Sequence, residues 1–153
     1  MSVTIVSGKQ WPDAVALLLR DLPEWFGIEQ SRLNYIDAAR TLPTSAALRN
    51  DDVVGVCLVR RHTSVAAEIE LLAVRPALHR QGIGRRLIRT VEDDLRDNGV
   101  ELLQVKTLGP SRVSEEYART RAFYQSMGFR ALEERTDIWG PENPCLISVK
   151  PLR

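Results

Sequence analysis

The stretch from Leu72 to Leu87 most constrains the fold, because a basic loop with two glycines joins an apolar strand to an amphipathic helix. Gly82 and Gly84 let the backbone approach a ligand closely. A helix that begins near Gly82 offers unpaired N–H groups and the positive end of its dipole. Positive side chains add to this, namely those of Arg80, Arg85 and Arg86. The stretch therefore predicts a cradle for a phosphate group.

Two familiar nucleotide motifs do not fit this loop. A dinucleotide fingerprint needs a third glycine where the chain has Leu87, and an acidic residue after the next strand, which ends in Lys106-Thr107. A P-loop needs Lys and then Ser or Thr after its last glycine, but Gly84 is followed by two arginines. The remaining alternative is a turn whose glycines serve close packing alone.

The surrounding pattern predicts a mixed sheet. A helix over 82–98 lies between strands at 66–74 and 100–107, and such a unit favours parallel pairing through a right-handed crossover. Further strands are predicted at 3–6, 45–49, 53–61, 129–138 and 146–149, and further helices at 11–19, 31–39 and from 114 or 115 to 127. Residues 22–27 break the first helix. The fold class is α+β, with about seven strands and about four helices.

Composition narrows the function classes. A chain of 153 residues with 44% hydrophobic residues fits one domain over 1–153. The net charge of +1 gives no general drive toward nucleic acid or an anionic membrane. No apolar run has the length of a membrane span, and the first residues lack a secretory layout, so a soluble cytoplasmic protein is expected. Cys57 and Cys145 have no metal-ligand spacing and are expected as buried thiols; no metal is predicted.

Residues 67–95 resemble the acetyl-CoA-binding motif of the GNAT superfamily of N-acetyltransferases. That motif is Arg/Gln-x-x-Gly-x-Gly/Ala after a strand ending in x-Val-x-Pro, and its leading residue falls on His79. Through Phe123-Tyr124-Gln125-Ser126-Met127-Gly128-Phe129 the likeness extends more weakly over most of the chain. The resemblance implies a GNAT-like fold, acetyl-CoA as the donor, and strands 66–74 and 100–107 that splay to open a cleft.

The resemblance also implies the residues that contact the cofactor. Backbone groups beside a bulge in strand 66–74 would hold the thioester and the pantetheine amides, the loop would hold the diphosphate, and two residues of the late helix would flank the cofactor. These positions are Leu72, Ala73, Val74, His79, Arg80, Gln81, Gly82, Ile83, Gly84, Arg85, Arg86, Tyr117 and Thr120. The family often has Asn where this chain has Tyr117.

Acetyl transfer to an amine needs a proton acceptor and a proton donor. Glu68 and Glu70 lie on one face of their strand, because side chains alternate with period two. The setting of Glu68 resembles that of the base in the histone acetyltransferase branch, so Glu68 is the first candidate base and Glu70 the second. The alternative is that both line the solvated face of an ordinary strand. Tyr124 occupies the tyrosine position of the family's late helix and is the candidate acid, with a core aromatic as the alternative.

The acceptor site is the least specified. Four aromatic residues occur in the early helices and the last hairpin, which flank the acceptor cleft in the resembling fold: Trp25, Phe26, Tyr35 and Trp139. They are predicted as an apolar substrate-binding wall, with ordinary core packing as the alternative. The sequence predicts transfer from acetyl-CoA to a primary amine, with a small-molecule acceptor preferred. A protein lysine or N-terminus, and a non-catalytic acyl-CoA-binding or sensing module, stay open, as does a homodimer.

Overall fold

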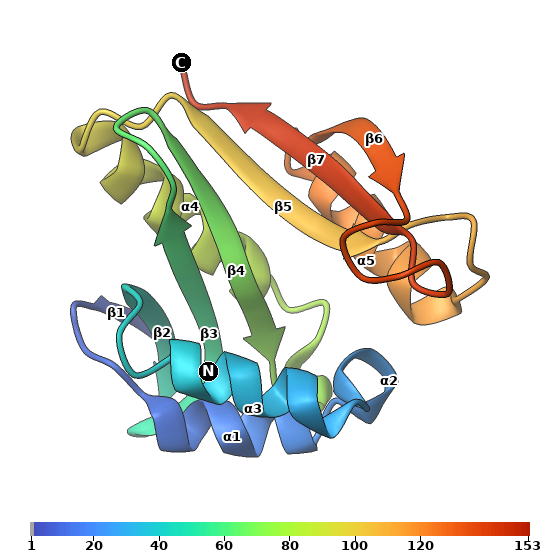
Figure 1. Cartoon of the computed structure of the whole chain (residues 1–153). Coiled ribbons are helices and arrows are strands. Elements are labelled where there is room, and N and C mark those ends of the chain that lie inside the picture. Colours follow the sequence, from blue (N-terminus) through green and yellow to red (C-terminus); the bar gives the residue numbers. More distant parts are fainter. Residues whose placement is uncertain (1) are drawn as a thin grey trace.

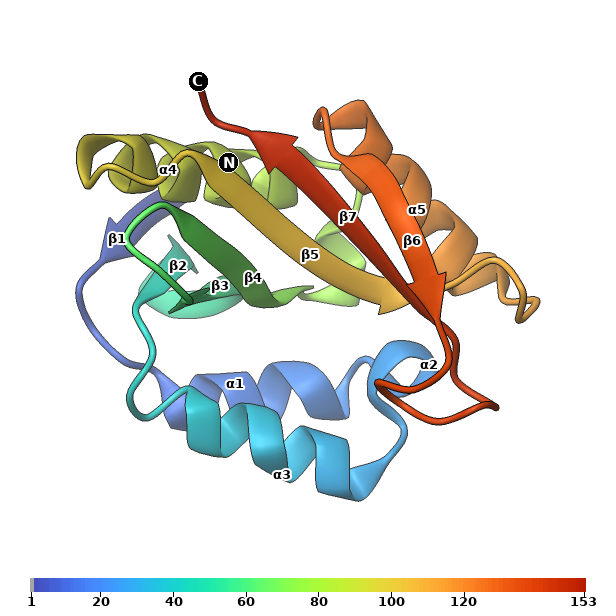
Figure 2. The ribbon, with the colours of Figure 1, turned by 45° about the horizontal axis from the view of Figure 1, so that its top comes forward.

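A computed structural model describes residues 2–153 and shows a single seven-stranded sheet with helices on both faces (Figures 1 and 2). The strand order is β1-β2-β3-β4-β5-β7-β6. The strands are β1 (Thr4–Ser7), β2 (Thr44–Arg49), β3 (Asp52–Arg61), β4 (Ala66–Val74), β5 (Leu102–Leu108), β6 (Arg130–Arg135) and β7 (Cys145–Pro151). The helices are α1 (Pro12–Arg20), α2 (Pro23–Phe26), α3 (Glu29–Ala38), α4 (Ile83–Asp97) and α5 (Glu115–Ser126), with a 3₁₀ turn at Pro76–Leu78. The predicted α+β class and the mixed sheet are confirmed.

The two faces of the sheet carry separate apolar clusters. Helices α4 and α5 cover one face, and α1, α2 and α3 lie on the other (Figure 2). Leu87 and Ile88 of α4 are fully buried in the first cluster, and Leu19 of α1 in the second. The apolar stripe predicted for 82–98 therefore packs on the sheet, as its helical period required.

Among residues 2–153, β4 and β5 are the one parallel pair, and the other strand pairs are antiparallel. Helix α4 supplies the crossover and ends at Asp97. Gly99, the residue after the C-cap Asn98, has a φ of +82°, as is common just past a helix C-terminus. The β2–β3 turn places Asn50 and Asp51 at φ of 51° and 68°, which is the geometry of a type I′ hairpin turn.

Strands β4 and β5 diverge along their length (Figure 1). Their ladder joins Ala66–Ile69 to Leu102–Val105 and then stops. Beyond that point β4 stays paired with β3 as far as Val74, while β5 stays paired with β7 as far as Leu108. Because each strand follows its other neighbour, the sheet opens between them, as the resemblance implied.

Strand β4 also contains a bulge at Glu70. Val59 of β3 faces Ile69 and Leu58 faces Leu71, so Glu70 has no partner residue on β3. As a result Ile69 packs in the cluster under α4, whereas Leu71 packs in the cluster under α1. The bulge turns the strand just before the segment expected to hold the thioester.

Two elements differ from the sequence expectations. The predicted break at 22–27 contains a one-turn helix, α2, because Pro23 fits the first turn of a helix, where its missing N–H is not needed. Strand β6 ends at Arg135 rather than 138, and all its residues are exposed at the sheet edge. Both cysteines are free and buried, as predicted. Within residues 2–153, none of the helices combines the length and the apolar character that crossing a bilayer requires.

Candidate active site

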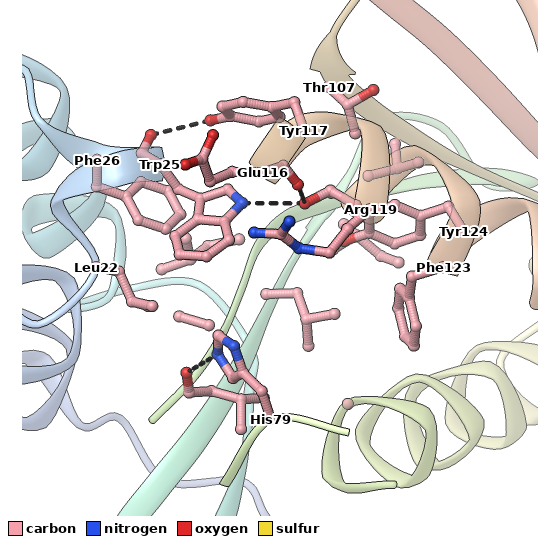
Figure 3. A pocket seen from close by; sticks show the side chains of 18 of the residues that line it. Leu22, Trp25, Phe26, His79, Thr107, Glu116, Tyr117, Arg119, Phe123 and Tyr124 are labelled. Atoms are coloured by element: carbon pink, nitrogen blue, oxygen red, sulfur yellow. Dashed lines mark hydrogen bonds between the residues drawn. The ribbon is translucent and has the colours of Figure 1, made fainter. Parts of the chain in front are cut away.

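A cavity of about 770 Å³ lies where β4 and β5 diverge. Its size is within the usual range for a small-molecule site. Its walls come from the ends of β4 and β5, the loop before α4, helix α5, and aromatic residues of α2, α3 and the β6–β7 loop (Figure 3). Elements from the N-terminal, middle and C-terminal parts of the chain therefore meet at one cleft.

The loop before α4 presents a row of free backbone donors. Among the described residues, no acceptor is found for the N–H groups of residues 80–85; the first bond of the helix runs from Arg86 to Gly82. Arg80 and Gly82 both have left-handed backbone, with φ of 64° and 81°. Successive N–H groups in such a turn form a concave anion site at the helix N-terminus. These residues fit the diphosphate of coenzyme A.

Some side chains of this loop line the cavity, whereas others do not. Arg80 and Arg85 line the cavity, whereas Gln81 and Arg86 do not. Arg86 donates to the carbonyl oxygen of Val3 at 2.8 Å. His79 lines the cavity, but its Nε2 donates to the carbonyl oxygen of Val74 at 2.7 Å. The Nε2–H group of the imidazole is thus bonded to the last residue of β4 and is not free to donate to a ligand.

The β5-facing edge of β4 has no ladder partner beyond Ile69. The three residues predicted to hold the thioester and pantetheine arm by their backbone, Leu72, Ala73 and Val74, all line the cavity. Ile83 and Gly84 of the first turn of α4 also line it. An extended arm with amide groups can pair with such an exposed strand edge, since the strand offers N–H and C=O groups in register.

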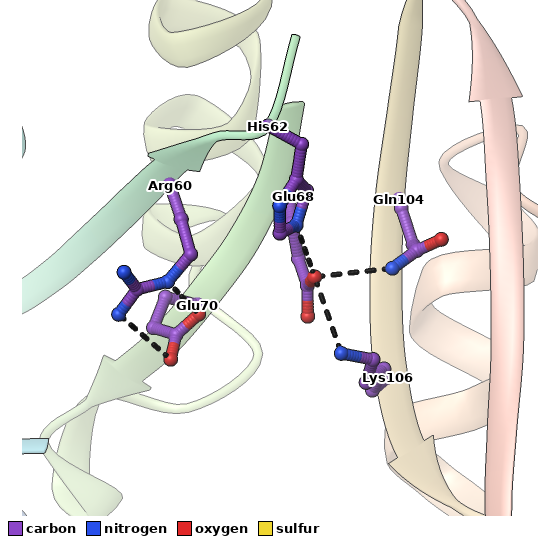
Figure 4. Close-up of polar contacts among 6 residues, drawn as sticks. All are labelled: Arg60, His62, Glu68, Glu70, Gln104 and Lys106. Carbon is purple, nitrogen blue, oxygen red and sulfur yellow. Dashed lines mark hydrogen bonds and ion pairs between the residues drawn. The ribbon is translucent and has the colours of Figure 1, made fainter. Parts of the chain in front are cut away.

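Glu68 is held by three donors on one oxygen (Figure 4). Its Oε1 accepts from His62 Nε2 at 2.7 Å, Gln104 Nε2 at 3.0 Å and Lys106 Nζ at 3.4 Å. Its side chain is only 6% exposed and is not among those that line the cavity. Its Oε2 has no partner among the described residues, which leaves that oxygen able to accept a proton through a water.

Glu70, the second candidate base, does line the cavity. Both of its oxygens face the guanidinium of Arg60, at 3.1 and 3.5 Å. The two carboxylates thus share one face, as period two predicted, but they differ in environment. Glu68 is buried with a free oxygen, whereas Glu70 reaches the cavity with a cation attached.

Tyr124 is buried and lines the cavity from α5. Its ring packs edge-on against Phe123 at 5.2 Å and Phe129 at 5.4 Å between centroids, so it also has the core contacts of the alternative interpretation. Burial raises the pKa of Tyr124 well above its ordinary value near 10. The hydroxyl therefore keeps its proton at neutral pH and is available as a donor.

Tyr117 and Thr120 line the cavity, but their hydroxyl groups donate their protons to backbone carbonyl oxygens of the protein. Tyr117 donates to the carbonyl oxygen of Trp25 at 2.9 Å. Thr120 donates to the carbonyl oxygen of Glu116 at 3.1 Å and accepts from the Trp25 indole N–H at 3.1 Å. Burial raises the pKa of Tyr117 to about 12. Each hydroxyl can accept from a ligand, but neither has a proton left to donate.

The four aromatic residues predicted as the acceptor wall, Trp25, Phe26, Tyr35 and Trp139, all line the cavity. Phe26 and Tyr35 pack edge-on at 5.6 Å, and Trp25 packs edge-on against His79 at 5.8 Å. Burial, and then the charges of Glu70 and Glu68, raise the pKa of Tyr35. Helix α2, absent from the sequence expectations, is the element that brings Trp25 and Phe26 here.

Sequence reasoning missed several polar residues of the cavity. Lys106, Thr107, Glu116 and Arg119 line it. The Thr107 hydroxyl is buried and has no hydrogen-bond partner among the described residues. Strand alternation could have placed Lys106 on one face with Gln104, but only the β4–β5 register brings that face to Glu68.

Comparison with known proteins agrees with this geometry. Residues 44–131 match the family model described as an acetyltransferase (GNAT) domain. The chain is 29% identical to an IAA acetyltransferase of Azospirillum brasilense, over 99% of each chain. Among solved structures, it is similar to a putative GNAT acetyltransferase of Desulfovibrio desulfuricans, with a TM-score of 0.83 and 22% identity over 99% and 100% of the two chains. It is also similar to a GNAT acetyltransferase of Elizabethkingia anophelis with acetyl-CoA bound, with a TM-score of 0.71 and 18% identity over 97% of each chain.

The splayed sheet, the N–H cradle and the family match define an acyltransferase. The chain belongs to the GNAT acetyltransferase superfamily, because the family model covers more than half of its length.

Proposed function

We propose that this chain, acting as one domain over residues 1–153, transfers the acetyl group of acetyl-CoA to a primary amine by direct transfer in a ternary complex. The observation that carries the proposal is the single cavity, which runs from the N–H cradle at 80–85 past the open edge of β4 to Glu70 and the aromatic wall. Donor and acceptor can therefore occupy one cleft at the same time.

Each part of the cleft has a role in this proposal. When bound, acetyl-CoA supplies the acetyl group as a thioester, which a neutral amine can attack. The cradle holds the diphosphate, and the β4 edge at Leu72–Val74 holds the arm and polarises the carbonyl through a backbone N–H. Glu68 takes the proton of the acceptor through a water, by way of its free Oε2.

Tyr124 supplies a proton toward the departing sulfur. Its raised pKa keeps the hydroxyl protonated, and its place in the cavity wall is compatible with that task. We expect a small molecule as the acceptor, because Trp25 of α2 is hydrogen-bonded to Thr120 and Tyr117 of α5, which joins two walls of the cavity to each other. A peptide amine is the second candidate acceptor.

The proposal is tested by thiol release from acetyl-CoA over a panel of small amines and peptides. Glu68→Gln should lower kcat by about 10²- to 10⁴-fold, the usual contribution of a positioned base. Glu70→Gln is the matched variant, because it removes the other carboxylate of the same strand face, and its effect should be smaller. Tyr124→Phe should also lower kcat.

Three results would contradict the proposal in different ways. Cofactor binding without thiol release for any acceptor would favour a sensing module. A larger loss in Glu70→Gln than in Glu68→Gln would move the base to Glu70. Unchanged turnover in Tyr124→Phe would leave Tyr124 as a core aromatic only.

A further inference from the structure

Three guanidinium groups line the cavity, and they come from two opposite walls. Arg80 and Arg85 belong to the loop and to the first turn of α4. Arg119 belongs to α5, across the cleft. The cradle residues were expected from the glycine motif, whereas nothing in the local sequence marks Arg119.

Arg119 makes no hydrogen bond or ion pair with any described residue. Other arginines of the fold are held: Arg121 of the same helix donates to the Leu108 carbonyl at 2.6 Å, and Arg60 pairs with Glu70. Glu116, one turn earlier on α5, also lines the cavity without pairing with Arg119. Figure 3 shows the Arg119 side chain pointing from α5 into the cavity. An unpaired guanidinium in a cleft is suited to bind a phosphate or carboxylate through two parallel hydrogen bonds.

The position of Arg119 on α5 favours a contact with the ligand group held by the N–H cradle at residues 80–85. Arg119 and Phe123 are four residues apart and lie on one helix face. A Cβ atom on Gly84 would lie 3.4 Å from the Phe123 ring, so this face of α5 packs directly against the first turn of α4. The part of the cavity lined by the aromatic residues contains the carboxylate of Glu70, so it is suited to a cationic amine and not to an anion that Arg119 could bind.

We propose that Arg119 binds the diphosphate of the coenzyme from the α5 wall, opposite the N–H groups of residues 80–85. The diphosphate is then bound from two walls of the cleft. Backbone N–H groups, Arg80 and Arg85 contact it from the loop and the first turn of α4, and the Arg119 guanidinium contacts it from α5. This inference rests on the proposed function for the identity of the donor. It adds a binding residue from a different element of the fold.

The test measures binding rather than turnover, by isothermal titration of coenzyme A, dephospho-coenzyme A and pantetheine. Arg119→Gln should bind coenzyme A and dephospho-coenzyme A about 10-fold more weakly than the unchanged protein does. Its affinity for pantetheine, which has no phosphate, should be unchanged. Arg119→Lys should recover part of the loss, because it restores the charge without the fork geometry. Arg89→Gln is the matched control, since it removes the same charge from an exposed arginine of α4 that does not line the cavity.

Several outcomes would overturn the inference. Equal affinity of Arg119→Gln and the unchanged protein for coenzyme A would overturn it while leaving the proposed function intact. A loss that disappears with dephospho-coenzyme A would move the contact to the 3′-phosphate. A loss that Arg89→Gln reproduces would reduce the effect to net charge. Failure of the unchanged protein to bind coenzyme A would overturn this inference and the proposed function together.

Discussion

Gly82 and Gly99 form a matched pair that tests whether the loop before α4 is built for a ligand. They flank the two ends of the same helix, with φ of +81° and +82°, and a Cβ atom on either would meet nothing within 4 Å. Substitution by Ala therefore introduces backbone strain without a steric clash at both sites. Only Gly82 lies in the cavity wall.

The stability cost follows from the left-handed backbone. Left-handed conformation costs a non-glycine residue about 1–2 kcal/mol, and the stiffer unfolded chain returns about 0.4–1 kcal/mol of this. The net loss is about 1 kcal/mol for each variant, which lowers Tm by about 2–4 °C in a chain of this size. Urea unfolding followed by circular dichroism measures the loss for both variants.

The two variants should differ in cofactor affinity. In Gly82→Ala the strain shifts the loop and tilts its N–H groups away from the ligand, and a hydrogen bond from each to a charged group is worth about 1.5–3 kcal/mol. We expect coenzyme A to bind at least about 10-fold more weakly to Gly82→Ala and as tightly as before to Gly99→Ala. Equal affinity of the two variants would refute the cradle, because the strain is the same in both.

Three further predictions concern the scaffold of the site. Burial raises the pKa of Cys57 from 9.0 to about 12, so above pH 9 its thiol ionises in the unfolded state but stays neutral in the folded state. The free energy of unfolding is therefore unaffected by this thiol below pH 9 and falls as the pH rises toward 12, by about 2 kcal/mol at pH 10.5. Cys57→Ala should remove this part of the alkaline loss, which urea titrations at pH 8 and 10.5 would measure. Glu92→Leu should destabilise the protein by about 3–5 kcal/mol, because it leaves Lys150 without its ion-pair partner, which lies at 2.6 Å. Adding Lys150→Met should restore most of that loss. A double variant as unstable as Glu92→Leu alone would contradict this interpretation of the ion pair. Trp25→Phe keeps a ring on α2 but removes the donor to Thr120, and we expect a loss of about 0.5–1.5 kcal/mol in thermal unfolding, whereas an unchanged Tm would mean that this bond does not hold α2 against α5.

Local sequence patterns were sufficient for most of the fold. The strand at 66–74 is found with those bounds, and the helix predicted over 82–98 is found at Ile83–Asp97. Period-two and period-3.6 patterns are read within one element, so they need no knowledge of its partners. Helix α2 was missed because four residues are too few to show a period, and its role depends on contacts with α5.

The candidate site was predictable only in part, because some of its features depend on contacts between separate elements. The glycine loop and the alternation of Glu68 and Glu70 are local, and both are found where expected. The different surroundings of the two carboxylates are not local. They depend on the β4–β5 register, which brings Gln104 and Lys106 to Glu68, and on the β3–β4 register, which leaves Glu70 in a bulge beside Arg60.

The sequence by itself thus determined the class of protein, through the resemblance of residues 67–95 to the family motif. It also determined the place of the glycine loop and the rows of side chains that each strand presents, because these follow from spacing along the chain. Only the tertiary structure decided which of those side chains are free. His79 is turned back to Val74, Tyr117 and Thr120 are engaged by Trp25, and Arg119 is left without a partner in the cleft. A hydrogen bond between residues 95 positions apart leaves no trace in local periodicity, since it is set by the packing of whole elements.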